Sequence, residues 1–178
     1  MSETQEYPID RLLKIVARSK YDGALRGLIK YGINRNTRCK IYPVLIEAGF
    51  NLSDKVRVDV AATIAYLYQK AETSGRNKFG KCMKLLVNRS SSSTETIFHC
   101  IMKTNTTSSM LELIKRSVTH MIDKNIAIDF KSLYYDLDEL CHNILEWNCQ
   151  VRENWAIQYW GNKNSLLTEE QLCMGGDE

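Results

Sequence analysis

The chain has 178 residues, of which 44% are hydrophobic and 25% are charged, a composition that allows a packed core and argues against wholesale disorder. With only 2 prolines and 9 glycines, it favours long helices over many short strands. The formal net charge is only +3, but basic residues dominate from 11 to 40 and acidic residues from 136 to the C-terminus. This asymmetry suggests a polyanion at one end and a different neighbour at the other, unless both are solvated helix faces.

The first half of the chain predicts four helices, because apolar residues recur there at three- and four-residue steps. Pro8 can open the first helix, since the N–H that proline lacks would have no partner in a first turn. Asp22 can cap the second helix and Gly32 can end it in the left-handed conformation that glycine tolerates. The four helices are expected from Pro8 onward, from Asp22 to Gly32, from Pro43 to Gly49, and from a cap at Ser53 or Asp54 to Lys70.

The second half continues the helical pattern between short polar turns. The expected helices are 81–87, one capped by Thr94, one over 110–122 capped by Ser108 or Ser109, one capped by Asp129 that can continue to Trp147, and one over 151–160. The sequence therefore predicts an all-α fold of two small bundles that meet near the loop at 70–80. We expect the N-terminal bundle over 1–75, the C-terminal bundle over 76–161, and a polar, flexible tail over 162–178.

No motif for catalysis or for metal binding is recognisable. The sequence contains no Gly-rich phosphate loop and no HExxH pattern, and its six cysteines show neither CxxC nor zinc-finger spacing. We expect no catalytic residue, no metal and no cofactor, with the thiols as small core residues. A small helical enzyme that uses His120 or His142 with a nearby cysteine stays an alternative. Without a signal peptide or an apolar membrane span, we expect a cytoplasmic protein with reduced thiols.

Basic residues at helical spacing point to the backbone of a nucleic acid. Arg26 and Lys30 lie four residues apart and share one helical face, and Lys115 and Arg116 form a doublet. Lys and Arg bind phosphates through charge, without reading bases. Such rows can also merely solubilise a surface. The candidate nucleic-acid-binding residues are Arg18, Arg26, Lys30, Lys78, Lys81, Lys115 and Arg116.

A series of motifs in one order adds a family resemblance. The motifs are GALR at 23–26, YPVL at 42–45, FGK at 79–81, IDF at 128–130, Trp147, and VRENWAIQYW at 151–160. Together they resemble the CasB family, the small helical subunit of the type I-E CRISPR complex Cascade. The resemblance extends from about Asp22 to Trp160.

The resemblance implies an all-α, non-catalytic subunit that acts in antiviral defence. It implies a head-to-tail dimer of two copies along Cascade, in contact with the backbone subunits that hold the CRISPR RNA and with the large subunit. It also implies a basic face that stabilises the R-loop by holding the target and displaced DNA strands. Asp129, Trp147, Arg152 and Trp155 belong to the structural motif, with the tryptophans, Trp160 included, expected in the core and Arg152 as an ion-pair partner. The main alternative is an all-helical protein–protein adaptor with no nucleic-acid role.

Overall fold

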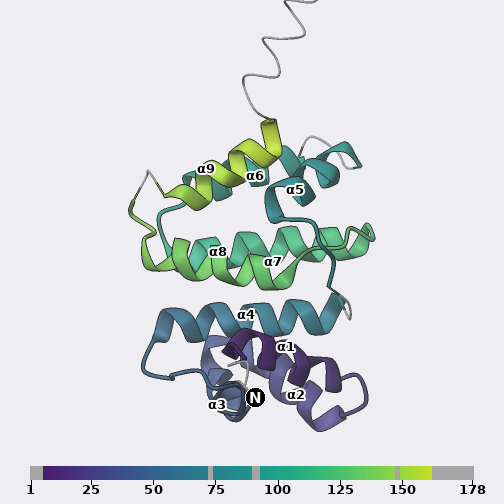
Figure 1. Ribbon diagram of the computed structural model, residues 1–178, viewed down its shortest axis with the longest axis vertical. Helices are drawn as coiled ribbons and strands as arrows, with labels where there is room; N and C mark the ends of the chain where they lie inside the picture. The colour runs from purple at the N-terminus through teal and green to yellow at the C-terminus, as the bar shows by residue number, and fades with distance from the viewer. Residues whose placement is uncertain (1–5, 72–73, 90–92, 147–148, 162–178) are drawn as a thin grey trace, which may run out of the picture.

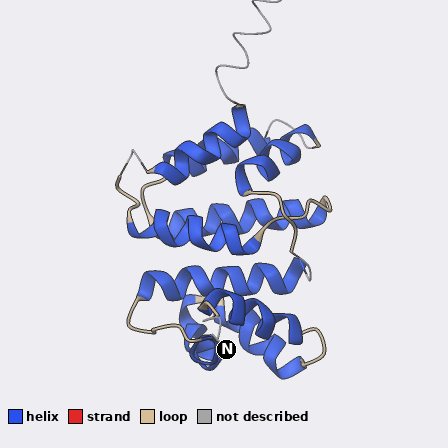
Figure 2. Cartoon of the chain, in the orientation of Figure 1, coloured by secondary structure: helices blue, strands red, loops and turns tan. Residues whose placement is uncertain are grey.

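The computed structural model describes residues 6–71, 74–89, 93–146 and 149–161. Within these ranges the fold is all-α, as predicted, and the only β-structure is a parallel bridge between Asn77 and Ile128 (Figure 2). The helices are α1 (Pro8–Arg18), α2 (Gly23–Gly32), the 3-10 helix η1 (Arg35–Ile41), α3 (Tyr42–Ala48), α4 (Lys55–Ala71), α5 (Phe79–Asn88), α6 (Ser93–Lys103), α7 (Thr107–Asp123), α8 (Phe130–His142) and α9 (Gln150–Trp160). None of these described helices is long and apolar enough to cross a membrane.

The helices stack in three tiers along the longest axis of the molecule (Figure 1). The first tier holds α1, α2 and α3, with α4 lying across them, the second holds α7 and α8, and the third holds α5, α6 and α9. After α4 the chain therefore crosses to the far tier, returns to the middle one for α7 and α8, and goes back for α9. Helix α4 packs both on the first tier and on α7 and α8.

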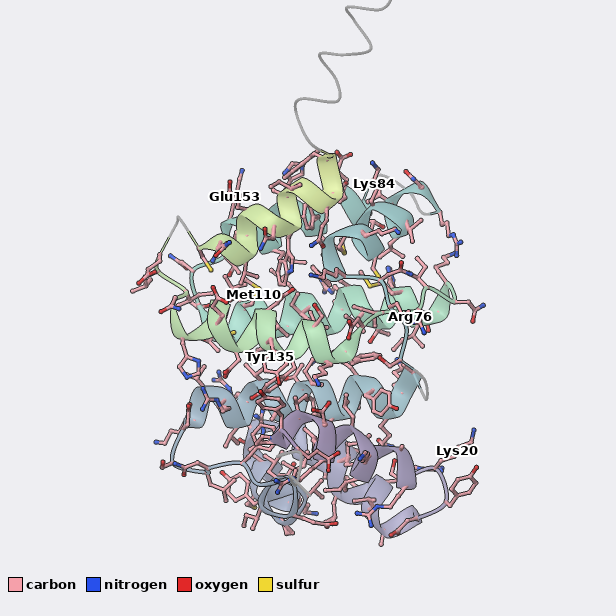
Figure 3. All side chains as sticks on the ribbon, viewed as in Figure 1. Lys20, Arg76, Lys84, Met110, Tyr135 and Glu153 are labelled. Atoms are coloured by element: carbon pink, nitrogen blue, oxygen red, sulfur yellow. The ribbon has the colours of Figure 1, made fainter. Side chains whose placement is uncertain are left out.

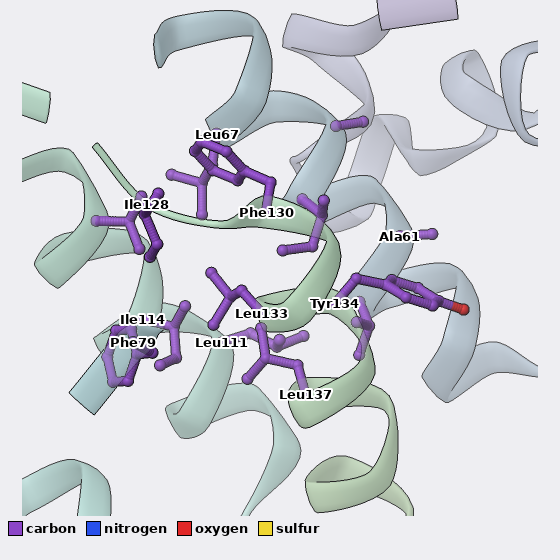
Figure 4. Close-up of a cluster of buried hydrophobic side chains, with 14 of the residues drawn as sticks. Ala61, Leu67, Phe79, Leu111, Ile114, Ile128, Phe130, Leu133, Tyr134 and Leu137 are labelled. Atoms are coloured by element: carbon purple, nitrogen blue, oxygen red, sulfur yellow. The ribbon is translucent and has the colours of Figure 1, made fainter. Parts of the chain in front are cut away.

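The hydrophobic core runs through all three tiers. Where α4 meets α7 and α8, Leu67, Ile114 and Phe130 are fully buried together with Leu133 and Leu137 (Figure 4). The same connected cluster includes Leu12 of α1 and Trp155 of α9, at opposite ends of the molecule. One continuous core spans the proposed boundary between bundles over 1–75 and 76–161. The core therefore does not mark this division, which stays a prediction.

Polar contacts also join α4 and α1 to α8. The guanidinium of Arg57 donates to both carboxylate oxygens of Asp138, at 3.0 to 3.2 Å, a bidentate geometry that is stronger than a single hydrogen bond. Lys131 of α8 lies 2.8 Å from a carboxylate oxygen of Asp10 in α1. These pairs fix how the middle tier sits on the first.

Three of the predicted helix caps are confirmed. Side-chain oxygens of Asp22, Asp54 and Asp129 accept hydrogen bonds from the backbone N–H three residues later, at 2.9 to 3.0 Å. These bonds satisfy N–H groups that have no partner inside the helix. At α7 the prediction of Ser108 or Ser109 is wrong, because Thr106 accepts from the Ser109 N–H at 3.3 Å.

Three other helix-end predictions differ from the structure. Helix α6 already includes Ser93, so Thr94 is a buried first-turn residue and not its cap. Gly32 ends α2 without a positive φ; a Cβ there would overlap the Ile41 side chain, so close packing and not a left-handed turn explains this glycine. Helix α8 ends at His142 and does not continue to Trp147. Trp147 itself and the predicted tail, 162–178, lie outside the described residues.

Candidate nucleic-acid interface

The predicted basic residues occupy separate parts of the surface. Arg26 and Lys30 line one pocket beside the end of α4, and Lys115 lines a second pocket near its beginning. Arg116 is exposed on α7, while Lys78 and Lys81 lie at the start of α5, on the far tier. Of the seven candidates, Arg26 and Lys30 are the pair that shares one of these two pockets.

The first pocket lies where the end of α1, helix α2 and the end of α4 meet. Its volume is about 320 Å³, and Lys20 and Lys70 line it beside Arg26 and Lys30. Sequence reasoning missed Lys20 and Lys70. Lys70 lies 40 residues after Lys30, and only the packing of α2 on α4 brings the two to one site.

The second pocket, of about 530 Å³, lies between η1, α4 and α7. Here the charges are largely matched: Arg38 pairs with Asp59, and Lys115 pairs with Glu112 at 2.5 Å. The Nε of Arg38 is buried and has no hydrogen-bond partner among the described residues. Because carboxylates neutralise two of its cations, this pocket attracts anions less than the first does.

Both pockets face the same stripe of α4. Asp59 and Thr63 line the second pocket, and Tyr66 and Lys70 line the first. Positions 59, 63, 66 and 70 follow at steps of three and four residues, which places them on one helical face. The rise of about 1.5 Å per residue separates the ends of this stripe by about 16 Å.

Exposed basic side chains occur at each level of the molecule. Figure 3 labels Lys20 beside the first tier, Arg76 in the connection from α4 to α5, and Lys84 on α5 in the far tier. All three are exposed, and the predicted Lys78 and Lys81 lie between Arg76 and Lys84 in the chain. Arg18, by contrast, is held by Glu47, whose carboxylate accepts from its guanidinium at 2.6 Å. Exposed cations of this kind can bind a phosphate backbone without reading its sequence.

Arg152 has a structural role of a different kind from the predicted ion pair. It is 5% exposed, and its guanidinium donates to the backbone carbonyls of Met102, Thr104 and Ile144 at 2.5, 2.7 and 3.4 Å. Burial lowers its pKa. Arg152 thus binds the end of α6 and the segment after α8 to α9, and it is not available to a phosphate.

The two tryptophans of α9 differ in how deeply they are buried. Trp155 is fully buried, its ring centroid 4.6 Å from that of Phe79, and its indole N–H donates to Asp136 at 2.7 Å. The expectation that Trp160 lies in the core is wrong, because it is 47% exposed and meets Phe98 by an edge contact. Its position at the last residue of α9 explains this exposure.

The histidines and cysteines form no catalytic constellation within the described residues. Cys141 adjoins His142 in sequence, but burial raises the pKa of its thiol to about 12, so the nucleophilic thiolate is scarce near neutral pH. His142 lies 3.2 Å from a carboxylate oxygen of Asp54, and His120 is exposed on α7. No group of three or more metal-ligating side chains occurs in the part of the chain that is described.

Comparison with protein families tests the resemblance found in the sequence. Residues 36–160 match the family described as CRISPR-associated protein Cse2. The chain belongs to the Cse2 family. This confirms the resemblance found in the sequence, since Cse2 is the small subunit of type I-E Cascade. The Cse2 match includes Lys78, Lys81, Lys115 and Arg116, and it begins after Arg18, Arg26 and Lys30.

The Cse2 chain also resembles a solved structure. That structure is described as a CRISPR RNA-guided surveillance complex; its matching chain is 20% identical, with a TM-score of 0.62. The match covers 92% of this chain and 97% of that chain. At this identity the likeness establishes a shared fold over nearly the full length of both. A search of curated proteins finds no match.

Proposed function

We propose that this Cse2-family chain is a non-catalytic subunit of a type I-E Cascade complex that acts in antiviral defence in the cytoplasm. In this proposal it joins the backbone subunits, the large subunit and the CRISPR RNA, and pairs with a second copy of itself. Its basic residues hold the phosphate backbones of target and displaced DNA and so stabilise the R-loop. The observation that carries the proposal is the family match over residues 36–160.

The distribution of charge supports a role at nucleic acid. R-loop formation exchanges a DNA duplex for an RNA–DNA heteroduplex of similar stability, so modest protein–backbone contacts can tip the balance. Lys81 and Arg116 are exposed and form no ion pair within the described residues. They are therefore better placed to bind phosphate than Arg18, which Glu47 already engages.

The test is copurification followed by an R-loop assay. A tagged chain is expressed with its chromosomal neighbours and a CRISPR array, and we expect a ribonucleoprotein particle with a short guide RNA. The double variant Lys81→Glu/Arg116→Glu should assemble normally but form R-loops at least about tenfold less well at moderate salt, because removing cations that pair with phosphates weakens binding steeply. The matched control is Lys55→Glu/Lys103→Glu, which reverses the charge at two other exposed lysines and so changes the net charge equally.

Two results would count against the proposal. If the tagged chain elutes alone and free of RNA although its neighbours are present, it is not a Cascade subunit. If the particle assembles but the double variant forms R-loops as well as the control, the chain acts as a protein–protein adaptor without a nucleic-acid role.

A further inference from the structure

The pocket between the end of α1, helix α2 and the end of α4 has a surplus of positive charge. Four cations line it, Lys20, Arg26, Lys30 and Lys70, and none of its described lining residues is acidic. The C-terminal ends of α1, α2 and α4 lie there, and each helix C-terminus carries about half a negative charge. Even without Lys20, the three cations Arg26, Lys30 and Lys70 exceed the total of about one and a half negative charges at these ends. The surplus suits an anion.

The floor of this pocket is held by hydrogen bonds. The guanidinium of Arg26 donates to the carbonyl oxygens of Ser19 and Lys20 at 3.3 and 2.7 Å. The amide of Gln69 donates to the Ser19 hydroxyl and to the Arg26 carbonyl, at 3.2 and 3.4 Å. Ser19 itself is 2% exposed. These bonds fix the part of the pocket around Arg26 before a ligand arrives, which reduces the entropy lost there on binding.

Two of the lysines remain available to a ligand. Lys30 and Lys70 are exposed, and neither forms an ion pair or hydrogen bond through its side chain within the described residues. They come from the last turns of α2 and α4. Their ammonium groups can therefore close on one anion from two sides.

Aromatic and apolar side chains also line the pocket. Tyr66 and Tyr68 line it together with Val16, and Tyr68 is supported from behind by Phe130, with ring centroids 5.4 Å apart. Tyrosine rings offer a surface on which any base can pack. The volume of about 320 Å³ is at the lower end of the range for small-ligand pockets.

We propose that this pocket binds a single nucleotide unit, with its phosphate on Lys30 and Lys70 and its base or sugar against Tyr66. The unit is either a free nucleotide or one residue of a single strand. The second source rests on the proposed function, since it requires the chain to contact nucleic acid. A phosphate with an attached ring fits this cationic and aromatic lining better than phosphate alone.

The test uses the full chain, three probes and matched variants. The probes are inorganic phosphate, adenosine monophosphate, and a labelled single strand of about ten thymidines. Lys30→Gln/Lys70→Gln is compared with Lys55→Gln/Lys103→Gln, two exposed lysines outside both pockets. Tyr66→Leu tests the aromatic lining, and thermal melting verifies that every variant folds.

We expect the pocket variant, and not its control, to lose at least about tenfold in affinity for adenosine monophosphate or for the strand. For the strand, the negative slope of log affinity against log salt should become shallower by about 0.7, since the variant neutralises one phosphate fewer. Tyr66→Leu should weaken binding of the nucleotide more than that of phosphate. If only the strand binds, and the pocket variant binds it more weakly, the nucleotide unit that occupies the pocket comes from a nucleic-acid strand and not from a free nucleotide.

Other results would overturn the inference. If adenosine monophosphate does not bind and the strand binds equally well to the pocket variant and its control, the site is not here, while the proposed function stands. If inorganic phosphate binds as tightly as the nucleotide and Tyr66→Leu changes neither, the pocket takes phosphate alone. If neither adenosine monophosphate nor the strand binds, the inference fails, and nucleic-acid contact by the free chain fails with it.

Discussion

Single residues show how tertiary contacts decide what a sequence motif does. Arg152 and Trp155 are neighbours in the VRENWAIQYW motif, and both serve the core: one binds three backbone carbonyls and the other donates to Asp136. Sequence spacing identified the motif but could not reveal these partners, which lie between 8 and 50 residues away. A basic residue next to aromatic ones is thus a poor guide to phosphate binding when its helix is buried.

The bond between Trp155 and Asp136 predicts a pH-dependent loss of stability. Burial raises the pKa of Asp136, while the Trp155 N–H lowers it. A carboxyl with a raised folded pKa favours folding at low pH, and this contribution is lost as the pH rises through that pKa. Trp155→Phe removes the donor and raises the pKa further. The free energy of unfolding of the variant should therefore be about 2 kcal/mol lower than that of the wild type near pH 7. Near pH 4 the difference should be smaller.

Urea unfolding of the variant at both pH values measures this loss. In an Asp136→Asn background there is no carboxyl to titrate, so the loss caused by Trp155→Phe should hardly change between the two. An equal loss at both pH values in the wild-type background would mean that only ring packing on Phe79 matters.

At the scale of elements, the sequence predicted the helices well and their ends less well. Amphipathic repeats located α4 and α7, because the spacing of apolar residues reflects burial directly. The sequence allowed α8 to continue to Trp147, but the helix ends at His142, and the carbonyl of Ile144 beyond this end accepts from Arg152. The sequence predicted part of the first pocket, because Arg26 and Lys30 share a helix face. It did not predict Lys70, which joins them only through packing of α2 on α4.

Helix α2 offers a direct comparison of two glycines. A Cβ on Gly32 would overlap the Ile41 side chain, whereas one on Gly27 would meet nothing within 4 Å. Gly27→Ala should stabilise the fold by about 0.5–1 kcal/mol through helix propensity. Gly32→Ala should instead destabilise it by about 1–3 kcal/mol, because η1 must shift. Chemical denaturation of both variants measures the difference, and equal effects would show that α2 and η1 separate without cost.

At the scale of the whole molecule, α4 connects the two bundles that the sequence predicts. It lies on α1, α2 and α3 and also packs on α7 and α8, and the Arg57–Asp138 pair fixes it to the middle tier. The same helix carries the stripe that lines both pockets. A rigid α4 therefore sets the spacing between the two pockets, and this spacing persists only if the tiers do not open independently.

This continuity predicts that the chain unfolds as one cooperative unit. All three tryptophans, at 147, 155 and 160, lie in the second half, so their fluorescence reports the C-terminal bundle, while far-UV circular dichroism reports every helix. The two transitions in urea should coincide. Arg57→Ala removes the bidentate pair and should shift both to lower urea together, because breaking a contact in a shared core destabilises the whole fold. A fluorescence transition separate from the loss of helix would instead establish two independent bundles near 1–75 and 76–161. The first pocket would then belong to a unit that folds without α9, and the second pocket would lie between the two bundles.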